Sequence, residues 1–242
     1  MLFSIIDGSP QVELALKSKT KLIKAADTIA SGTQMLVVDA IAIFGQTVWA
    51  CIVTGFQLGR LYYVIKFIRR IQRHDMNEVV SIWPSIQSTW KDALVQMTTM
   101  KFRAPETATT RTTMFTDASL VGWGVVILGY GNRQIRIFAG RWSEAEAKES
   151  INVLELRTLR IGIRILAQLK SDDEIISLDT FIDNTSARAW AIRRRAPRWS
   201  TNQLVIEMDA EAKQAKIQMT NIDYVESARN LADKPSRRFI PK

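Results

Sequence analysis

Apolar side chains recur at helical spacing through the first hundred residues. In residues 61–74, for example, Leu61, Ile65, Ile68 and Ile71 share one face, and basic residues occupy the other face. Patterns of this kind, together with long apolar stretches, predict helices over residues 11–31, 34–55, 61–74 and 85–100. The first part of the chain is therefore expected to be mostly helical.

The pattern changes after residue 113 to short apolar runs separated by Gly and Asn. Strands are predicted over residues 114–119, 121–128 and 134–141, with a turn at Gly129–Asn132. There follow a helix over 150–170, a strand over 175–183, helices over 185–195 and 202–214, a strand over 216–225 and a short helix from about 230. This order indicates the α/β class, with a mixed sheet flanked by helices.

A polar, threonine-rich segment separates these two parts. Residues 103–113 include Pro105 and lack an apolar period, which is typical of a linker. The sequence therefore predicts a domain boundary near residue 105. A mostly helical domain would cover residues 1–105, and an α/β domain would cover residues 106–242.

Residues 40–59 carry no charge between Asp39 and Arg60, and this length is sufficient to cross a bilayer. Gln46 and Gln57 interrupt the apolar run, and they favour a buried helix pair in a soluble domain. A membrane partner is therefore the less favoured alternative.

Composition and charge narrow the function classes. The chain is 47% hydrophobic and can bury a core. Its 33 Lys and Arg against 24 Asp and Glu give a net charge of +9, which favours a polyanionic partner such as nucleic acid.

The single Cys51 excludes an internal disulfide and favours a reducing, intracellular compartment, cytoplasm or nucleus. The single His74 excludes zinc sites built on two histidines, and no phosphate-binding loop or G-x-S-x-G elbow occurs.

Four carboxylates fall where solvent is not expected. Asp117 lies in an apolar strand, Glu155 on the apolar stripe of the long helix, Asp183 at a strand end and Asp233 beside the last short helix. Each has an ordinary alternative as a helix cap, a turn residue or a dipole partner, and Glu155 could close a capping box with Asn152. Together they indicate a cluster that needs divalent cations, for which magnesium suits an all-oxygen site.

These carboxylates lie in four motifs of the second domain. The motifs are TDASLVGWGV (116–125), INVLELRT (151–158), IDNTSA (182–187) and NLADKPSR (230–237). In order and spacing, residues 112–238 resemble the ribonuclease H domain of retroelement reverse transcriptases, of the DIRS-like or Ty3-like kind. Residues 12–104 resemble more faintly the thumb-to-connection segment that precedes that domain, through Ile43–Gly45 and Gly59–Leu61.

The resemblance implies a ribonuclease H-like fold and an endonuclease that hydrolyses the RNA strand of RNA–DNA hybrids by a two-metal mechanism. Asp117 would contact both magnesium ions, Glu155 and Asp183 would share one ion with it, and Asp233 would share the other. Manganese is the alternative metal. Selectivity for RNA–DNA hybrids would come from contacts between the protein and the 2′-hydroxyls of the RNA strand rather than from reading of the bases. A reverse transcriptase polymerase domain is the implied protein partner.

A basic cluster follows the third motif, with Trp190 and Trp199 interleaved. Arginine binds phosphates in a fork geometry, and tryptophan can stack on bases or sugars. We therefore predict nucleic-acid binding by Asn184, Arg188, Arg193, Arg194, Arg195 and Arg198. The alternative is a solvated helix face with core tryptophans.

The chain departs from the family pattern in two ways. Residues 223–229 contain no histidine, which many family members keep there, so slow turnover is expected. The polymerase motif Tyr-x-Asp-Asp is absent, and we expect a processed fragment, a truncated copy or a domesticated remnant of a reverse transcriptase. A catalytically inactive nucleic-acid-binding module of the same fold is the main alternative, and an integrase or junction resolvase is another.

Overall fold

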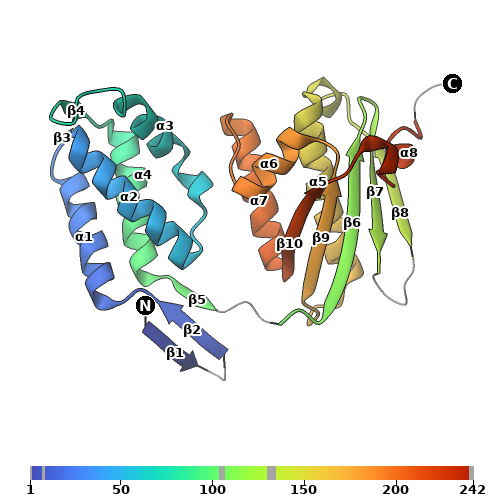
Figure 1. Ribbon diagram of the computed structural model, residues 1–242, viewed down its shortest axis with the longest axis horizontal. Coiled ribbons are helices and arrows are strands. Elements are labelled where there is room, and N and C mark those ends of the chain that lie inside the picture. Colours follow the sequence, from blue (N-terminus) through green and yellow to red (C-terminus); the bar gives the residue numbers. More distant parts are fainter. Residues whose placement is uncertain (1, 7–8, 104–106, 130–134, 240–242) are drawn as a thin grey trace. The chain divides into compact units, whose positions relative to one another are not determined.

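The computed structural model describes residues 2–6, 9–103, 107–129 and 135–239 (Figure 1). The chain divides into two compact units, residues 1–106 and 107–242. Most of the predicted turn at Gly129–Asn132, and the predicted start of the third strand at residue 134, lie outside the described residues.

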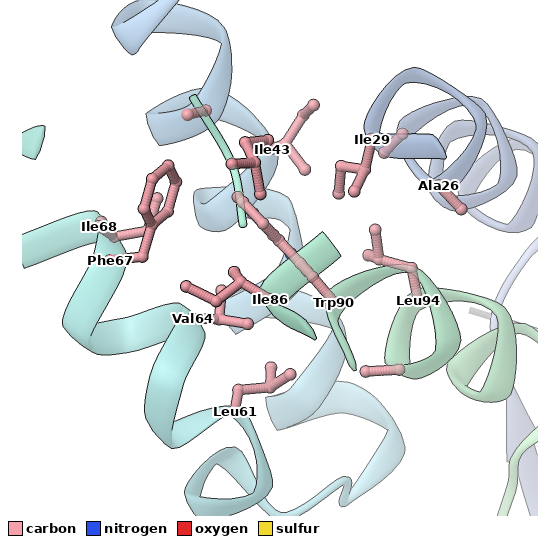
Figure 2. Packing of buried hydrophobic residues seen from close by; sticks show 14 of the residues in the cluster. Ala26, Ile29, Ile43, Leu61, Val64, Phe67, Ile68, Ile86, Trp90 and Leu94 are labelled. Atoms are coloured by element: carbon pink, nitrogen blue, oxygen red, sulfur yellow. The ribbon is translucent and has the colours of Figure 1, made fainter. Parts of the chain in front are cut away.

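Four helices among the described residues of the first unit surround one apolar core. They are α1 (Leu16–Ala30), α2 (Val37–Thr54), α3 (Tyr62–Ile71) and α4 (Pro84–Thr99), and the 3₁₀ turn η1 (Leu58–Leu61) precedes α3. Trp90 of α4 is completely buried, and its indole N–H donates to Thr47 Oγ1 of α2 at 2.8 Å. Figure 2 labels ten residues of this core: Ala26, Ile29, Ile43, Leu61, Val64, Phe67, Ile68, Ile86, Trp90 and Leu94.

Short strands flank the helices of the first unit. They are β1 (Leu2–Ile6), β2 (Ser9–Glu13) and β5 (Lys101–Arg103) in one sheet, and β3 (Gln34–Leu36) and β4 (Val79–Ser81) in another. The predicted helices over 11–31 and 34–55 therefore begin too early, because residues 9–13 and 34–36 pair as strands. Strands this short carry no readable period of their own.

Helix α2 is long and apolar enough, by length and composition alone, to cross a membrane. One side of it contributes to the core, where Val37, Ala40 and Ala50 are completely buried. The helix ends at Gly55, whose φ of 68° is left-handed and closes the last turn. Residues 40–59 therefore form one core helix followed by a 3₁₀ turn, and the predicted helix pair is wrong.

The second unit is built on a five-stranded sheet, with the order β10-β9-β6-β7-β8 among the described residues (Figure 1). The strands are β6 (Thr110–Ala118), β7 (Gly122–Leu128), β8 (Arg136–Arg141), β9 (Ile176–Ile182) and β10 (Ile217–Tyr224). β6, β9 and β10 are parallel, whereas β7 is antiparallel to both β6 and β8. This mixed sheet with its flanking helices confirms the predicted α/β fold class.

Helices pack on both faces of this sheet. They are α5 (Ile151–Leu169), α6 (Thr185–Arg193), α7 (Trp199–Gln214) and α8 (Asp233–Ser236), with single turns at η2 (Glu146–Lys148) and η3 (Ser227–Arg229). A Cβ at Gly162 would lie 2.5 Å from Met114 Sδ and 3.4 Å from Val125 Cγ1, so α5 packs directly on β6 and β7. Gly124 points to the other face, because neighbouring strand residues alternate, and there it meets α8.

The predicted elements of the second unit are confirmed with small shifts, except at the linker. Residues 110–113 form the first part of β6, although their threonine-rich sequence was expected to lie outside the sheet. Threonine is β-branched and suits a strand, so polarity was the misleading signal. Helix α7 starts at Trp199 rather than 202, and the last short helix starts at Asp233.

Candidate metal centre

Three of the four predicted carboxylates meet at one edge of the sheet. The parallel register pairs Thr116 of β6 with Ile182 of β9, so the residues that follow, Asp117 and Asp183, lie side by side. Glu155 reaches the same place from the second turn of α5. One carboxylate oxygen from each residue lies within 4.8 Å of the other two. We call Asp117, Glu155 and Asp183 the acidic triad.

The triad is largely removed from solvent. Asp117 and Glu155 are each 3% exposed, and Asp183 is half-buried. The Ala118 N–H donates to Glu155 Oε1 at 3.2 Å, and the Ser227 hydroxyl donates to Asp183 Oδ2 at 2.6 Å. Glu155 Oε2 is buried and has no hydrogen-bond partner among the described residues. A buried carboxylate oxygen without a partner is costly unless a proton or a cation compensates it.

Burial and repulsion change the protonation of two triad members. Burial raises the pKa of Asp117 to about 7; the Ser236 hydroxyl opposes this rise, and repulsion from Asp183 and Asp233 adds to it. Burial also raises the pKa of Glu155 to about 9, and repulsion from Asp117 and Asp183 contributes. Without a cation, the triad therefore retains protons at neutral pH.

The residues of the triad fit a divalent cation. All of their donor atoms are carboxylate oxygens, which are the ligands that hard cations such as Mg²⁺ and Mn²⁺ prefer. A cation between them would offset their mutual repulsion and would give Glu155 Oε2 a partner. The acidic cluster that the sequence predicted is therefore present, with three of its four members in contact range.

Asp233 lies apart from the triad. It is the first residue of α8, and its Oδ1 accepts a hydrogen bond from Arg237 Nε at 2.9 Å and forms an ion pair with Arg237 Nη2 at 2.8 Å. Asp233 still contributes to the raised pKa of Asp117, so the two carboxylates interact electrostatically. A role for Asp233 as a metal ligand requires that Arg237 share or release this carboxylate.

The capping alternatives for two triad members are wrong. Glu155 does not close a box with Asn152, because its Oε1 accepts from Ala118 N–H of β6. The cap of α6 is Asn184 rather than Asp183, since Asn184 Oδ1 accepts a backbone N–H of the first turn at 2.9 Å. Asn184 Nδ2 also donates to Asn152 Oδ1 at 2.8 Å, which places two amides beside the triad.

The sequence analysis missed two buried polar residues of the fourth motif. Asn230 is 5% exposed, and its Nδ2 donates to the Thr116 carbonyl at 3.0 Å. Ser236 is completely buried, and its hydroxyl donates to Asp117 Oδ2. Both contacts bridge more than a hundred positions of sequence, so no local pattern could have indicated them.

The predicted arginines lie on α6 and in the segment between α6 and α7. Arg188 donates to the Ile222 carbonyl at 2.8 Å, and Arg194 lies 3.5 Å from Asp209. Arg193 ends α6 eight residues after its start, which is about 12 Å of helical rise. The exposed members are Arg193, Arg194 and Arg198, and Arg188 and Arg195 are half-buried.

Comparison with known proteins gives matches to solved structures only. No protein-family model matches the sequence, and no protein of curated function matches it. The N-terminal RNase H domain of a Mycobacterium tuberculosis protein is 19% identical over 54% of this chain and 93% of its own, with a TM-score of 0.41. RNase H1 from the archaeon Halobacterium salinarum is 14% identical over 52% of this chain and 92% of its own, with a TM-score of 0.41.

A longer protein matches across both units. The foamy viral protease-reverse transcriptase, solved in complex with an RNA/DNA hybrid, is 14% identical over 99% of this chain, with a TM-score of 0.35. The chain spans 30% of that protein's length. At these identities the similarity concerns the fold.

Proposed function

We propose that this protein is an endonuclease that cleaves the RNA strand of RNA–DNA hybrids with divalent metal ions. The observation that carries the proposal is the acidic triad, whose three carboxylates bring oxygens within 4.8 Å of one another. Among the described residues, the hydrogen bonds that the triad accepts from outside it come from one backbone N–H and two serine hydroxyls rather than from Lys or Arg. Carboxylates gathered in this way suit a cation better than a structural ion pair.

The four acidic residues would each bind one or both of two metal ions. Asp117, Glu155 and Asp183 would hold one Mg²⁺ ion, and Asp117 with Asp233 would hold a second. Bound divalent cations offset negative charge at the phosphate and make water a better nucleophile at neutral pH. The Ala118 N–H holds one oxygen of Glu155, and the other oxygen, which is buried and has no hydrogen-bond partner among the described residues, would be available to the metal.

The substrate class rests on the sequence motifs, the charge of +9 and the groups beside the triad. An RNA strand differs from DNA by its 2′-hydroxyl, which both donates and accepts hydrogen bonds. The amides of Asn184 and Asn152 lie next to Asp183 and offer both functions. We propose that Asn184 contacts the sugars and that the arginines bind phosphates farther along the hybrid. These arginines are Arg188, Arg193, Arg194, Arg195 and Arg198.

The wider context is also part of the proposal. The four motifs resemble retroelement reverse transcriptases of the DIRS-like or Ty3-like kind, and the first unit would correspond to the thumb-to-connection segment. A polymerase domain would then be the protein partner, supplying hybrids as the product of DNA synthesis on an RNA template.

An inactive binding module is the second candidate function. Two observations favour it: residues 223–229 contain no histidine, and Arg237 holds the Asp233 carboxylate. Such a module would bind hybrids through the same basic residues without cutting them.

A strand-specific cleavage assay distinguishes the two functions. The purified chain would be mixed with Mg²⁺ and a hybrid labelled on its RNA strand, with EDTA, duplex DNA and single-stranded RNA as controls. Asp117→Asn should abolish cutting, whereas Asp172→Asn, an exposed turn residue with the same change of charge, should leave it unchanged. Salt-sensitive binding without cutting would favour the inactive module. Cutting that survives Asp117→Asn or EDTA would contradict the proposed mechanism.

A further inference from the structure

The short helix α8 is anchored to the end of β6 by a set of buried hydrogen bonds. The Ser119 hydroxyl donates to the Ser236 carbonyl at 2.8 Å, and Asn230 Nδ2 donates to the Thr116 carbonyl at 3.0 Å. A Cβ at Gly124 would lie 2.6 Å from the Ser236 N atom, so only glycine allows β7 and α8 to approach this closely. Ser236 is therefore held in place from several directions.

The hydroxyl of Ser236 is directed at the triad. It is completely buried, and it contacts Asp117 Oδ2 and the Asp233 carbonyl, the latter at 2.9 Å. Asp117 is the triad member that neighbours both other triad carboxylates and Asp233. A donor fixed on one of its oxygens restricts rotation of the carboxylate and leaves the other oxygen for a ligand.

We infer that Ser236 is a positioning residue, whose hydroxyl orients the Asp117 carboxylate for divalent-metal binding. This inference rests on the proposed function, because it assumes that the triad binds a cation. Ser236 touches neither substrate nor metal in this role and acts through Asp117. A hydrogen-bond partner of a metal ligand typically changes metal affinity by about 10–100-fold when it is removed.

Mn²⁺ binding to the full chain, measured by calorimetry in the absence of nucleic acid, tests the inference. Ser236→Ala removes the donor and should weaken Mn²⁺ binding by about 10–100-fold. Ser236→Thr keeps the hydroxyl and should bind within about threefold of the unmodified chain. Ser119→Ala is the matched control, because Ser119 anchors the same helix through the Ser236 carbonyl but does not contact Asp117. It should also stay within about threefold.

Three results would overturn the inference. Unchanged affinity in Ser236→Ala would overturn it and leave the proposed metal site intact. Equal losses in Ser236→Ala and Ser119→Ala, or no recovery in Ser236→Thr, would show that Ser236 only anchors α8. No Mn²⁺ binding by the unmodified chain would contradict the proposed function itself, and the inference would fail with it.

Discussion

Replacing Glu155 by Gln should change how the stability of the protein depends on pH. Burial raises the pKa of Glu155 to about 9 from an ordinary value of 4.5. The folded protein therefore keeps a proton that the unfolded chain releases, and its stability falls as the pH rises between these two values. Gln has nearly the same shape and no proton to release, so this slope should disappear in the variant.

The expected magnitude follows from the width of that pH window. One proton retained only in the folded state costs about 1.4 kcal/mol of stability per pH unit. Between about pH 6 and about pH 8, the unmodified chain should therefore lose about 2–3 kcal/mol that Glu155→Gln does not lose. The variant should match the unmodified chain only at about pH 4.5 and below, should be about 2 kcal/mol more stable near pH 6, and should gain about a further 2–3 kcal/mol by about pH 8.

Urea unfolding with EDTA present, followed by circular dichroism at several pH values, measures this difference. Comparing the two proteins at each pH cancels the contribution of the titrating groups that do not interact with Glu155. Glu144→Gln, an exposed residue of the same type, is the control and should show the slope of the unmodified chain. Equal slopes in Glu155→Gln and the unmodified chain would refute a raised pKa at Glu155.

Three further predictions concern the metal, the packing of α8 and the α5–α7 contact. Mn²⁺ should raise the melting temperature more at about pH 8 than at about pH 6, because the triad must lose protons to bind it; an equal shift at both values would contradict this. Gly124→Ala should cost about 1–3 kcal/mol in urea unfolding and weaken Mn²⁺ binding, since its Cβ would lie 2.5 Å from a backbone oxygen at the start of α8. Arg160→Ala should cost about 1–3 kcal/mol, because this arginine is 15% exposed and donates to Glu211 at 2.6 Å and 2.9 Å. Arg164→Ala, which removes a 54% exposed partner of the same carboxylate, should cost less than about 1 kcal/mol. A larger loss of stability in Arg164→Ala than in Arg160→Ala would contradict this reasoning.

Much of the second unit could be predicted from the sequence because its strands and its long helix have strong periods. The helix expected over residues 150–170 spans Ile151–Leu169, and the strand expected over 175–183 spans Ile176–Ile182. The choice of Asp117, Glu155 and Asp183 rested on carboxylates in apolar contexts, and burial bears this out for Asp117 and Glu155. A charge that breaks an apolar pattern is informative because its burial is costly.

The parts that could not be predicted depend on contacts between distant segments. β3 and β4 are three residues each and form only because they pair with each other. Ser236 lies in a polar stretch that has the composition of a turn, and its burial depends on Gly124, far away in the sequence. The sequence also did not single out the ion pair between Asp233 and Arg237. Two charged residues at i, i+4 spacing can pair on any helix, so the spacing alone does not mark this pair as important.

Anomalous diffraction from crystals soaked in Mn²⁺ would test the central claim, that three carboxylates jointly form a divalent-cation site. The account predicts a peak within coordination distance, about 2 Å, of oxygens from Asp117, Glu155 and Asp183. The peak should be absent in crystals of Asp117→Asn. Manganese bound only at other carboxylates, or no bound manganese at a pH where the triad is ionised, would contradict the claim.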